Sequence, residues 1–435
     1  MTERVVFLFP GQGAYLPGAF ADLGADAEPV EECVAEIDAA AAEFGHAPVR
    51  PLLFSTDAPA LGQLLRSDHE RLDVATLASS IGLARLLEER WGIRPDHVLG
   101  HSLGEFAALA VAGVLTPADA TRAVCERHTA LRKAPPGGGM LAVNVSPARA
   151  EELITSAGAL AVAVSAHNSP EQTVISGDEA DLSKVQKAAG EAGVRRSRLH
   201  VASSFHIPQL ADASALYATT LRNIPMSPPR ERCFYSHGLG RYLTAADDVV
   251  DLMVADMTRP VRFHEAVSAL HDDGVTAFVE CGPLDVLTKI VSVILPSALT
   301  VAPLRDAATT SDLPALLRPL SPSTAADDSA SDAAEPAGAS AEPGIDAEVL
   351  ETVRAVCSEI LEYPPEVITD DADLTADLGA DSLTLSELLE RALQRYGLED
   401  RFHEGNAGGY ATVAELATFV TGLVREGDAT PSGQR

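Results

Sequence analysis

The chain has 435 residues, of which 46% are apolar and 22% charged, a composition that supports a sizeable buried core and excludes bulk disorder. Its formal net charge of −31 repels phosphate backbones, so we expect no nucleic-acid partner. The longest strongly apolar run, 106–115, is too short to span a membrane, and no cleavage site follows the apolar run at 5–9. The sequence therefore predicts a cytoplasmic protein that does not enter membranes.

Residues 321–345 are rich in Ala, Ser, Pro and acids, which predicts a flexible linker between two domains. The first domain, 1–320, is large, whereas the second, 346–428, is small. Residues 346–435 hold 19 acidic and 6 basic residues and no lysine, so the second domain is an acidic module. The five cysteines are scattered and never spaced as CxxC, which indicates reduced thiols and argues against a disulfide framework or a zinc site.

In 1–320, strands alternate with helices, which predicts an α/β fold with a parallel sheet covered by helices. The clearest of these elements are a strand at 5–9, a helix at 74–90, a strand at 97–99, a helix at 104–114 and a strand at 277–280. The segment 138–202 has the order strand, helix, strand, strand, helix, strand, which predicts an inserted ferredoxin-like subdomain. In the second domain, apolar residues recur at helical spacing over 347–361, 383–396 and 412–424, which predicts an all-α bundle.

A serine lies in a glycine-flanked turn, Gly100-His101-Ser102-Leu103-Gly104, between the strand predicted at 97–99 and the helix predicted at 104–114. This context is that of a nucleophile elbow, in which a tight turn exposes the serine at the edge of a sheet. The following helix N-terminus offers N–H groups and a positive dipole end to an oxyanion. The sequence thus predicts Ser102 as a catalytic nucleophile; the alternative is a turn whose serine caps the helix.

Several separated motifs resemble those of one enzyme family. They are Phe7-Leu8-Phe9-Pro10-Gly11-Gln12-Gly13, Gly100-His101-Ser102-Leu103-Gly104-Glu105, Asn168-Ser169-Pro170, Val174-Ile175-Ser176-Gly177 and Glu280-Cys281-Gly282-Pro283. With these motifs in order over residues 4–305, the chain is similar to malonyl-CoA:acyl carrier protein transacylases and to polyketide synthase acyltransferase domains. This family carries an inserted subdomain at the place where the pattern of 138–202 predicts one.

The resemblance implies that His206, in Ser203-Ser204-Phe205-His206, is the general base that activates Ser102. His101, adjacent to the serine, is expected to pack and not to react. In this family a backbone carbonyl orients the catalytic histidine. The corresponding residue is Asp256, where family members usually have Asn or Gln, so a carboxylate–histidine pair also stays open.

The resemblance also assigns substrate contacts. The oxyanion hole is expected at the main-chain N–H groups of Gln12 and Leu103. Arg127 corresponds to the arginine whose planar guanidinium pairs with the free carboxylate of a malonyl-type acyl group; a salt bridge on the helix surface is the alternative. Phe205 would crowd the α-carbon of the acyl group, as in malonyl-selective members, and Asn168 is expected to bind substrate as well.

One departure from the family bears on the substrate. Where the family usually has Gln-Pro, this chain has Asp73-Val74. An acid at this place either faces solvent or puts a negative charge near the acyl pocket. In the second case the charge would favour a polar or cationic malonyl derivative.

The second domain contains Asp377-Leu378-Gly379-Ala380-Asp381-Ser382-Leu383, followed by an amphipathic helix. This pattern resembles the phosphopantetheine attachment site of acyl carrier proteins, over residues 347–426. The resemblance implies that Ser382 carries 4'-phosphopantetheine covalently, since a phosphodiester is favoured at a helix N-terminus. A serine that only caps an acidic helix is the alternative. Acids within 381–390 would dock basic patches of partner enzymes, and the long, glycine-rich segment 404–410 allows a displaced or missing third helix.

Together these features predict an acyltransferase without a metal, which moves a malonyl-type group from CoA to Ser102 and then to a phosphopantetheine thiol, in cis on Ser382 or in trans. The expected pathway is polyketide or fatty-acid-like biosynthesis. The expected partners are malonyl-CoA or a derivative, acyl carrier proteins, a ketosynthase and a phosphopantetheinyl transferase. Three alternatives stay open at this point: a proofreading acyl hydrolase, a carrier-to-carrier acyltransferase and a degenerate acyltransferase that serves only as a docking scaffold.

Overall fold

A parallel sheet of four short strands forms the centre of the first of two units, Met1–Pro322 and Ser323–Arg435. The computed structural model describes residues 4–134, 137–199, 201, 203–231, 233–307, 312–320, 346–361, 368–370, 372, 374, 382–398 and 412–428. The predicted linker at 321–345, the motif residues 377–381 and the segment 404–410 lie outside the described residues. Among the described helices, none combines the length and the apolar composition that a membrane crossing requires.

The strand β1 (Val5–Phe9) lies inside this sheet, in the order β11-β10-β1-β2. β2 (His97–Gly100), β10 (Ala277–Glu280) and β11 (Leu299–Val301) complete it, and each neighbouring pair is parallel. All five residues of β1 are buried, as expected of a strand covered by helices on both faces. The predicted α/β fold is confirmed.

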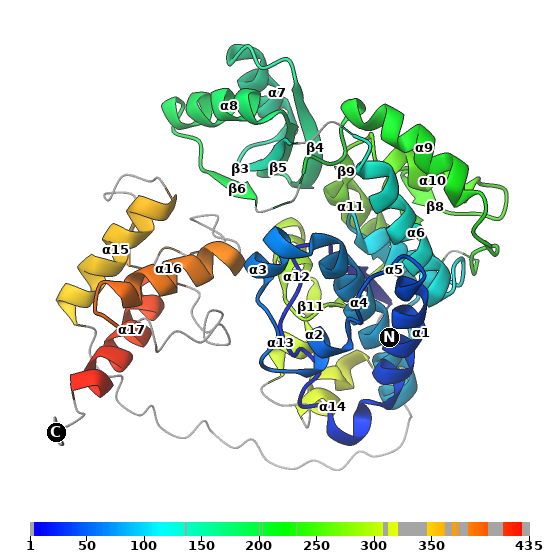
Figure 1. Ribbon diagram of the computed structural model, residues 1–435, viewed down its shortest axis with the longest axis horizontal. Helices are drawn as coiled ribbons and strands as arrows, with labels where there is room; N and C mark the ends of the chain where they lie inside the picture. The colour runs from blue at the N-terminus through cyan, green and yellow to red at the C-terminus, as the bar shows by residue number, and fades with distance from the viewer. Residues whose placement is uncertain are drawn as a thin grey trace. The chain divides into compact units, whose positions relative to one another are not determined.

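Alternate residues of β1 belong to different apolar cores. Phe7 shares its core with four helices that Figure 1 shows beside the sheet: α1 (Glu28–Ala42), α4 (His69–Trp91), α5 (Gly104–Val111) and α6 (Pro117–Leu131). Leu8, on the opposite face, packs with α11 (Phe263–Asp272) and α12 (Val286–Ile294). The carboxyl ends of β1 and β2 are therefore held between two packed layers, which makes their loops a rigid platform.

Helix α4 begins at His69, earlier than the predicted Val74. The side chain of Asp68 accepts the main-chain N–H of Arg71 and so caps the helix N-terminus. The helix ends before Gly92, which adopts a left-handed conformation with φ of 66°. The extra turn brings Glu70 and Asp73 into the helix.

The segment between α6 and residue 200 has the predicted element order. It consists of β3 (Gly139–Val143), α7 (Pro147–Ser156), β4 (Val162–Ser169), β5 (Gln172–Gly177), α8 (Glu179–Glu191) and β6 (Arg196–Leu199). The strands pair antiparallel in the order β6-β3-β5-β4, which is the ferredoxin-like arrangement, and β9 (Val261–Arg262) adds a parallel edge. Figure 1 shows α7 and α8 side by side against this sheet.

The other described elements of the first unit are mostly short. They are α2 (Arg50–Phe54), α3 (Leu61–Ser67), α9 (Ala211–Leu221), β7 (Tyr235–Ser236), β8 (Arg241–Tyr242), α10 (Val249–Asp256), α13 (Pro303–Asp306), α14 (Leu313–Leu317) and the 3-10 helices η1 (Gly24–Asp26), η2 (Pro208–Leu210) and η4 (Arg318–Leu320).

The second unit contains three described helices. They are α15 (Ala347–Leu361), α16 (Ser382–Gln394) and α17 (Val413–Asp428). Their apolar faces meet in one core that includes Val353, Leu389 and Leu416. The predicted helical carrier region is confirmed, with each helix within a few residues of its predicted range.

Glu280, at the end of β10, gives a testable prediction for stability. Its fully buried carboxyl oxygen Oε2 accepts hydrogen bonds from the N–H of Leu287 (2.8 Å) and the N–H of Thr288 (2.9 Å). Burial raises the pKa of Glu280 to about 8. The folded protein thus keeps a proton that the unfolded chain releases, so stability is lost as the pH rises toward 8.

We expect the free energy of unfolding of the wild type to fall by about 1.4 kcal/mol per pH unit from this one group as the pH rises through neutrality. Glu280→Gln mimics the protonated acid and should flatten that part of the slope. Urea unfolding of both proteins at several pH values measures the difference. Equal slopes in the two proteins would show that Glu280 is ionised in the fold.

Candidate active site

Ser102 lies in the turn between β2 and α5 with a strained backbone, φ of 55°. The flanking glycines are required by close backbone contacts. A Cβ on Gly104 would lie 1.9 Å from the carbonyl oxygen of Phe9, and a Cβ on Gly100 would lie 2.4 Å from the nitrogen of Glu105. The turn is therefore a nucleophile elbow, in which strain holds the hydroxyl away from its own backbone.

His206 is the partner of this serine. Its Nε2 lies 2.7 Å from Ser102 Oγ, and its Nδ1 lies 2.7 Å from the main-chain carbonyl oxygen of Asp256. Since a carbonyl only accepts, Nδ1 donates the proton and Nε2 presents its lone pair to the hydroxyl. His206 is 4% exposed and, with Ser102, is one of the two non-glycine residues with positive φ in the described part of the chain.

The carboxylate of Asp256 does not take the orienting role. Its Oδ1 lies 3.6 Å from His206 Nδ1, beyond a hydrogen bond, and 3.5 Å from Nε2 of the buried His237. Oε1 of Glu105 lies 3.1 Å from the same His237 nitrogen. Burial alone would lower the pKa of His237, but the Glu105 carboxylate raises it overall, and burial raises the pKa of Asp256. In the structure the main-chain carbonyl of Asp256, and not its carboxylate, lies within hydrogen-bond distance of His206 Nδ1.

The loop after β1 lies against the elbow, because β1 and β2 are parallel neighbours. A Cβ on Gly11 would lie 3.6 Å from Cβ of Ser102. Within the described residues, the main-chain N–H groups of Gln12 and Leu103 donate to no other group. Two unpaired N–H groups, one from each loop, are the donor arrangement that an oxyanion hole requires.

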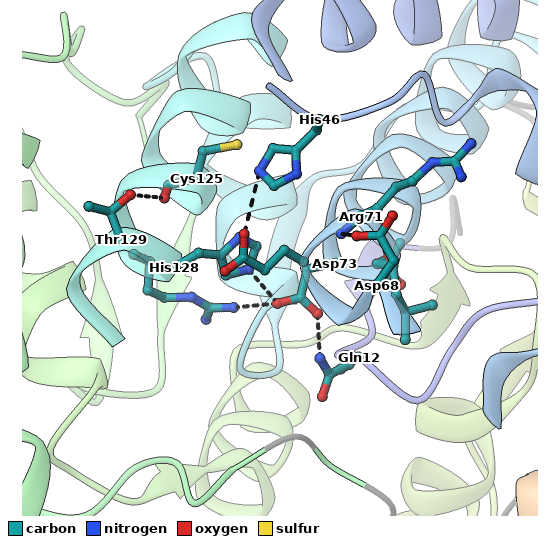
Figure 2. Close-up of polar contacts among 12 residues, drawn as sticks. Gln12, His46, Asp68, Arg71, Asp73, Cys125, His128 and Thr129 are labelled. Carbon is teal, nitrogen blue, oxygen red and sulfur yellow. Dashed lines mark hydrogen bonds and ion pairs between the residues drawn. The ribbon is translucent and has the colours of Figure 1, made fainter. Parts of the chain in front are cut away.

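Asp73 is the centre of a buried polar network that Figure 2 shows in close-up. Its Oδ1 accepts from Gln12 Nε2 at 2.6 Å, and its Oδ2 accepts from His128 Nε2 at 2.8 Å and from Arg127 Nη2 at 3.3 Å. Burial would raise the pKa of Asp73, but the hydrogen bond from His128 and the charge of Arg127 outweigh burial and lower it. Asp73 is 3% exposed, so the solvent-facing alternative for this acid is wrong.

Arg127 is buried rather than on a helix surface. It is 6% exposed and its guanidinium carbon lies 5.1 Å from the ring centre of Phe106. Its guanidinium pairs with Asp73 on α4, so the alternative of a salt bridge on the helix surface is wrong. Asp73 thus joins the guanidinium of Arg127 to the side chain of Gln12, which lies in the loop after β1. His128 follows Arg127 in α6, and the sequence analysis predicts no role for it. Only the tertiary structure shows that both side chains contact Asp73 on α4.

Asn168 and Phe205, both expected to contact substrate, lie near the elbow in different ways. Asn168 Oδ1 lies 2.9 Å from Nε2 of His101, and its Nδ2 donates to Gln172 Oε1 at 2.9 Å. Both polar groups of Asn168 are thus used within the protein. The contact of Asn168 Oδ1 holds His101 in place as a packing residue, and burial lowers the pKa of His101 to about 4. Phe205 is half-buried directly before His206, and its N–H donates to Ser176 Oγ at 3.0 Å.

In the second unit, Ser382 is the first residue of α16. The helix after it runs to Gln394 and is long enough to offer a formed N-terminus to an anion. The preceding residues of the predicted attachment motif, 377–381, lie outside the described part of the chain.

A serine in a strained elbow turn, an imidazole within hydrogen-bond distance of its hydroxyl and two unpaired N–H groups are the arrangement that serine-dependent acyl transfer requires. The chain belongs to the acyl transferase domain family, whose model matches residues 6–314. The phosphopantetheine attachment site model matches residues 351–420, so the second unit is a carrier domain with covalent 4'-phosphopantetheine.

Curated relatives are much longer proteins. The chain is 35% identical over 293 residues to a spectinabilin polyketide synthase protein of Streptomyces orinoci, covering 66% of this chain and 8% of the relative. It is 35% identical over 314 residues to an erythronolide synthase of Saccharopolyspora erythraea, covering 70% of this chain and 9% of the relative. The chain thus spans less than a tenth of the length of these two relatives.

Solved structures match the first unit. The acyltransferase domain of the second module of the salinomycin polyketide synthase is 33% identical with a TM-score of 0.62, over 73% of each chain. Malonyl-CoA:acyl carrier protein transacylase of Xanthomonas oryzae is 30% identical with a TM-score of 0.64, over 73% of this chain and 98% of that chain. The family and fold expected from the motifs are confirmed.

Proposed function

We propose that the chain transfers a malonyl-type acyl group from CoA to Ser102 and from there to a phosphopantetheine thiol, in polyketide or fatty-acid-like biosynthesis. The observation that carries this proposal is the buried guanidinium of Arg127, which shares the carboxylate of Asp73 with the side chain of Gln12 on the loop after β1. A guanidinium there suits an acyl group with a free carboxylate.

In the first half-reaction, Nε2 of His206 takes the hydroxyl proton as Ser102 Oγ attacks the thioester carbonyl of the acyl donor. The N–H groups of Gln12 and Leu103 stabilise the tetrahedral oxyanion. When the C–S bond breaks, His206 gives its proton to the leaving thiolate. The main-chain carbonyl of Asp256 stabilises the imidazolium that forms in between.

The second half-reaction reverses these roles. The phosphopantetheine arm, which Ser382 would hold, supplies a thiol that accepts the acyl group as a thioester. His206 removes the proton of the attacking thiol, and the same two N–H groups hold the second oxyanion. His206 then returns the proton to Ser102 Oγ, which restores the free enzyme.

The carrier domain on the same chain makes loading in cis a direct route, and transfer to a separate carrier uses the same site. One similar structure is a type II polyketide synthase acyl carrier protein in complex with its malonyl-transacylase, 26% identical with a TM-score of 0.65. We propose acyl carrier proteins and a ketosynthase as partners, and a phosphopantetheinyl transferase as the enzyme that modifies Ser382. The exposed Glu390 and the half-buried Glu387 on α16 suit basic surfaces of such partners.

Intact-mass analysis of the phosphopantetheinylated chain with malonyl-CoA, methylmalonyl-CoA and acetyl-CoA tests the proposal. We expect a malonyl increment on Ser382 in the wild type, and an increment on Ser102 alone in Ser382→Ala, since that variant lacks the acceptor. A loading rate that does not depend on protein concentration identifies transfer in cis. If no CoA ester labels either serine, CoA is not the donor, and transfer between carriers replaces this proposal.

Asp256→Asn tests which atom of Asp256 orients His206. The substitution keeps the main-chain carbonyl at 2.7 Å and removes only the carboxylate charge. We expect kcat for acyl transfer to change by less than about threefold. Steady-state kinetics at neutral pH measure the change. A loss of about 100-fold would show that the carboxylate takes part in catalysis.

A further inference from the structure

Three metal-ligating side chains meet outside the catalytic machinery. His46 lies in the loop after α1, Glu70 lies in the first turn of α4 and His128 lies in α6. Each offers one ligand atom, and these atoms lie within 4.8 Å of one another. Nε2 of His46 is 3.7 Å from Oε2 of Glu70, and the rings of His46 and His128 stand edge to face at 6.3 Å. No step of acyl transfer uses this cluster.

His128 is prepared to act as a ligand. Its Nε2 donates to the ionised carboxylate of Asp73 at 2.8 Å, so the ring proton stays on that nitrogen. Its Nδ1 is buried and has no hydrogen-bond partner, although the residue is only 3% exposed. A buried lone pair without a donor is unfavourable unless a cation occupies the place in front of it. A carboxylate that orients a histidine through its other nitrogen is the usual second contact of a metal-bound imidazole.

The other two side chains fit the same chemistry. His46 is half-buried, and its Nε2 lies 3.7 Å from Oε2 of Glu70, so the imidazole and the carboxylate can bind one ion together. Oε1 of Glu70 is held by Arg132, which leaves Oε2 toward His46. The side chains of His46 and Glu70 are 12% and 16% exposed, so an ion and a water ligand can enter from that side. Figure 2 shows His46 and Asp73 close to His128, with a dashed line from His128 to the carboxylate of Asp73.

We propose that His46, Glu70 and His128 bind one divalent transition-metal ion, with water as a fourth ligand. Two imidazoles and one carboxylate are a donor set that favours Zn²⁺ over the oxygen-seeking Ca²⁺ and Mg²⁺. Bonds of about 2.0–2.2 Å need the three ligand atoms to draw together by less than about 1.5 Å. None of the three proposed ligands is a cysteine, so the absence of a CxxC pair in the sequence does not argue against this site.

The ion would tie the loop after α1 to α4 and α6, the two helices that carry Asp73 and Arg127. It is therefore a structural site that positions the acyl pocket, and the Ser102–His206 pair does not depend on it. We expect metal removal to raise KM for the acyl donor and to leave kcat nearly unchanged.

The test uses the full chain without an affinity tag, stripped of metal with a chelator and titrated with Zn²⁺ by calorimetry. Co²⁺ serves as a second probe, because its visible absorption reports four-coordinate geometry. We expect one equivalent to bind the wild type and to raise its Tm. His46→Ala should weaken binding at least about tenfold and abolish the Tm shift.

His69→Ala is the matched control, because His69 is an exposed histidine next to Glu70 and outside the cluster. Its binding curve should equal that of the wild type. Glu70→Gln, which keeps the side-chain shape, should weaken binding as His46→Ala does. The proposal is overturned if the wild type binds neither Zn²⁺ nor Co²⁺ at micromolar concentration, or if His46→Ala and His69→Ala bind equally well.

Discussion

Ser102→Ala should slow acyl-enzyme formation by at least about 10⁴-fold, the largest effect expected of any single substitution here. The hydroxyl that Nε2 of His206 contacts at 2.7 Å is the atom that would form the ester, and no nearby group replaces it. Loading of the carrier thiol should disappear with it, since both half-reactions pass through this oxygen. Intact mass after incubation with malonyl-CoA, on a sample already carrying phosphopantetheine, measures both.

The control for this experiment is Ser292→Ala, which removes an exposed serine hydroxyl on α12 that contacts only Thr288 O and Thr300 Oγ1, far in sequence from the site residues. That variant should load as the wild type does. Circular dichroism and Tm establish that Ser102→Ala is folded, since alanine and serine tolerate the positive φ at this turn about equally. Loading retained in a folded Ser102→Ala chain would remove Ser102 from the mechanism.

Arg127→Ala should lower kcat/KM for malonyl transfer about 100-fold and leave acetyl transfer within about threefold. The reason is that charge-assisted hydrogen bonds to a carboxylate contribute about 1.5–3 kcal/mol, and acetyl has no carboxylate to lose them. Parallel kinetics with malonyl-CoA and acetyl-CoA as donors measure the ratio. If both rates fall equally, Arg127 stabilises the fold and does not recognise the carboxylate of the acyl group.

Asp73→Gln is the matched variant for this prediction. Removing Arg127 leaves the carboxylate of Asp73 buried with less compensation, which endangers the fold. Asp73→Gln instead keeps the side chain polar and frees the guanidinium from its competing carboxylate. We expect malonyl kcat/KM to rise about tenfold in this variant, because substrate and Asp73 compete for the same donors. A fall in malonyl transfer would show that Asp73 presents Arg127 to the substrate and does not compete with it.

Local patterns predicted much of the architecture. The alternation of apolar strands and helical runs predicted the parallel sheet, and the βαββαβ order predicted the inserted subdomain, because side-chain period and turn residues are local properties. The start of α4 was missed because a capping aspartate, Asp68, extended the helix beyond its apolar stripe. The elbow was predictable because Gly100, Ser102 and Gly104 are close in sequence and the turn itself demands them.

Sequence alone determined the family motifs, the nucleophile with its glycines and the presence of a second, acidic helical module. Tertiary structure alone decided the partners of Arg127 and Asp256. Asp73 is 54 residues from Arg127, and the two meet only because α4 and α6 pack against the same core. Likewise, the carbonyl and not the carboxylate of Asp256 faces His206 because of where α10 ends. Hydrogen bonds between distant elements depend on packing and backbone direction, and residue spacing carries no record of either.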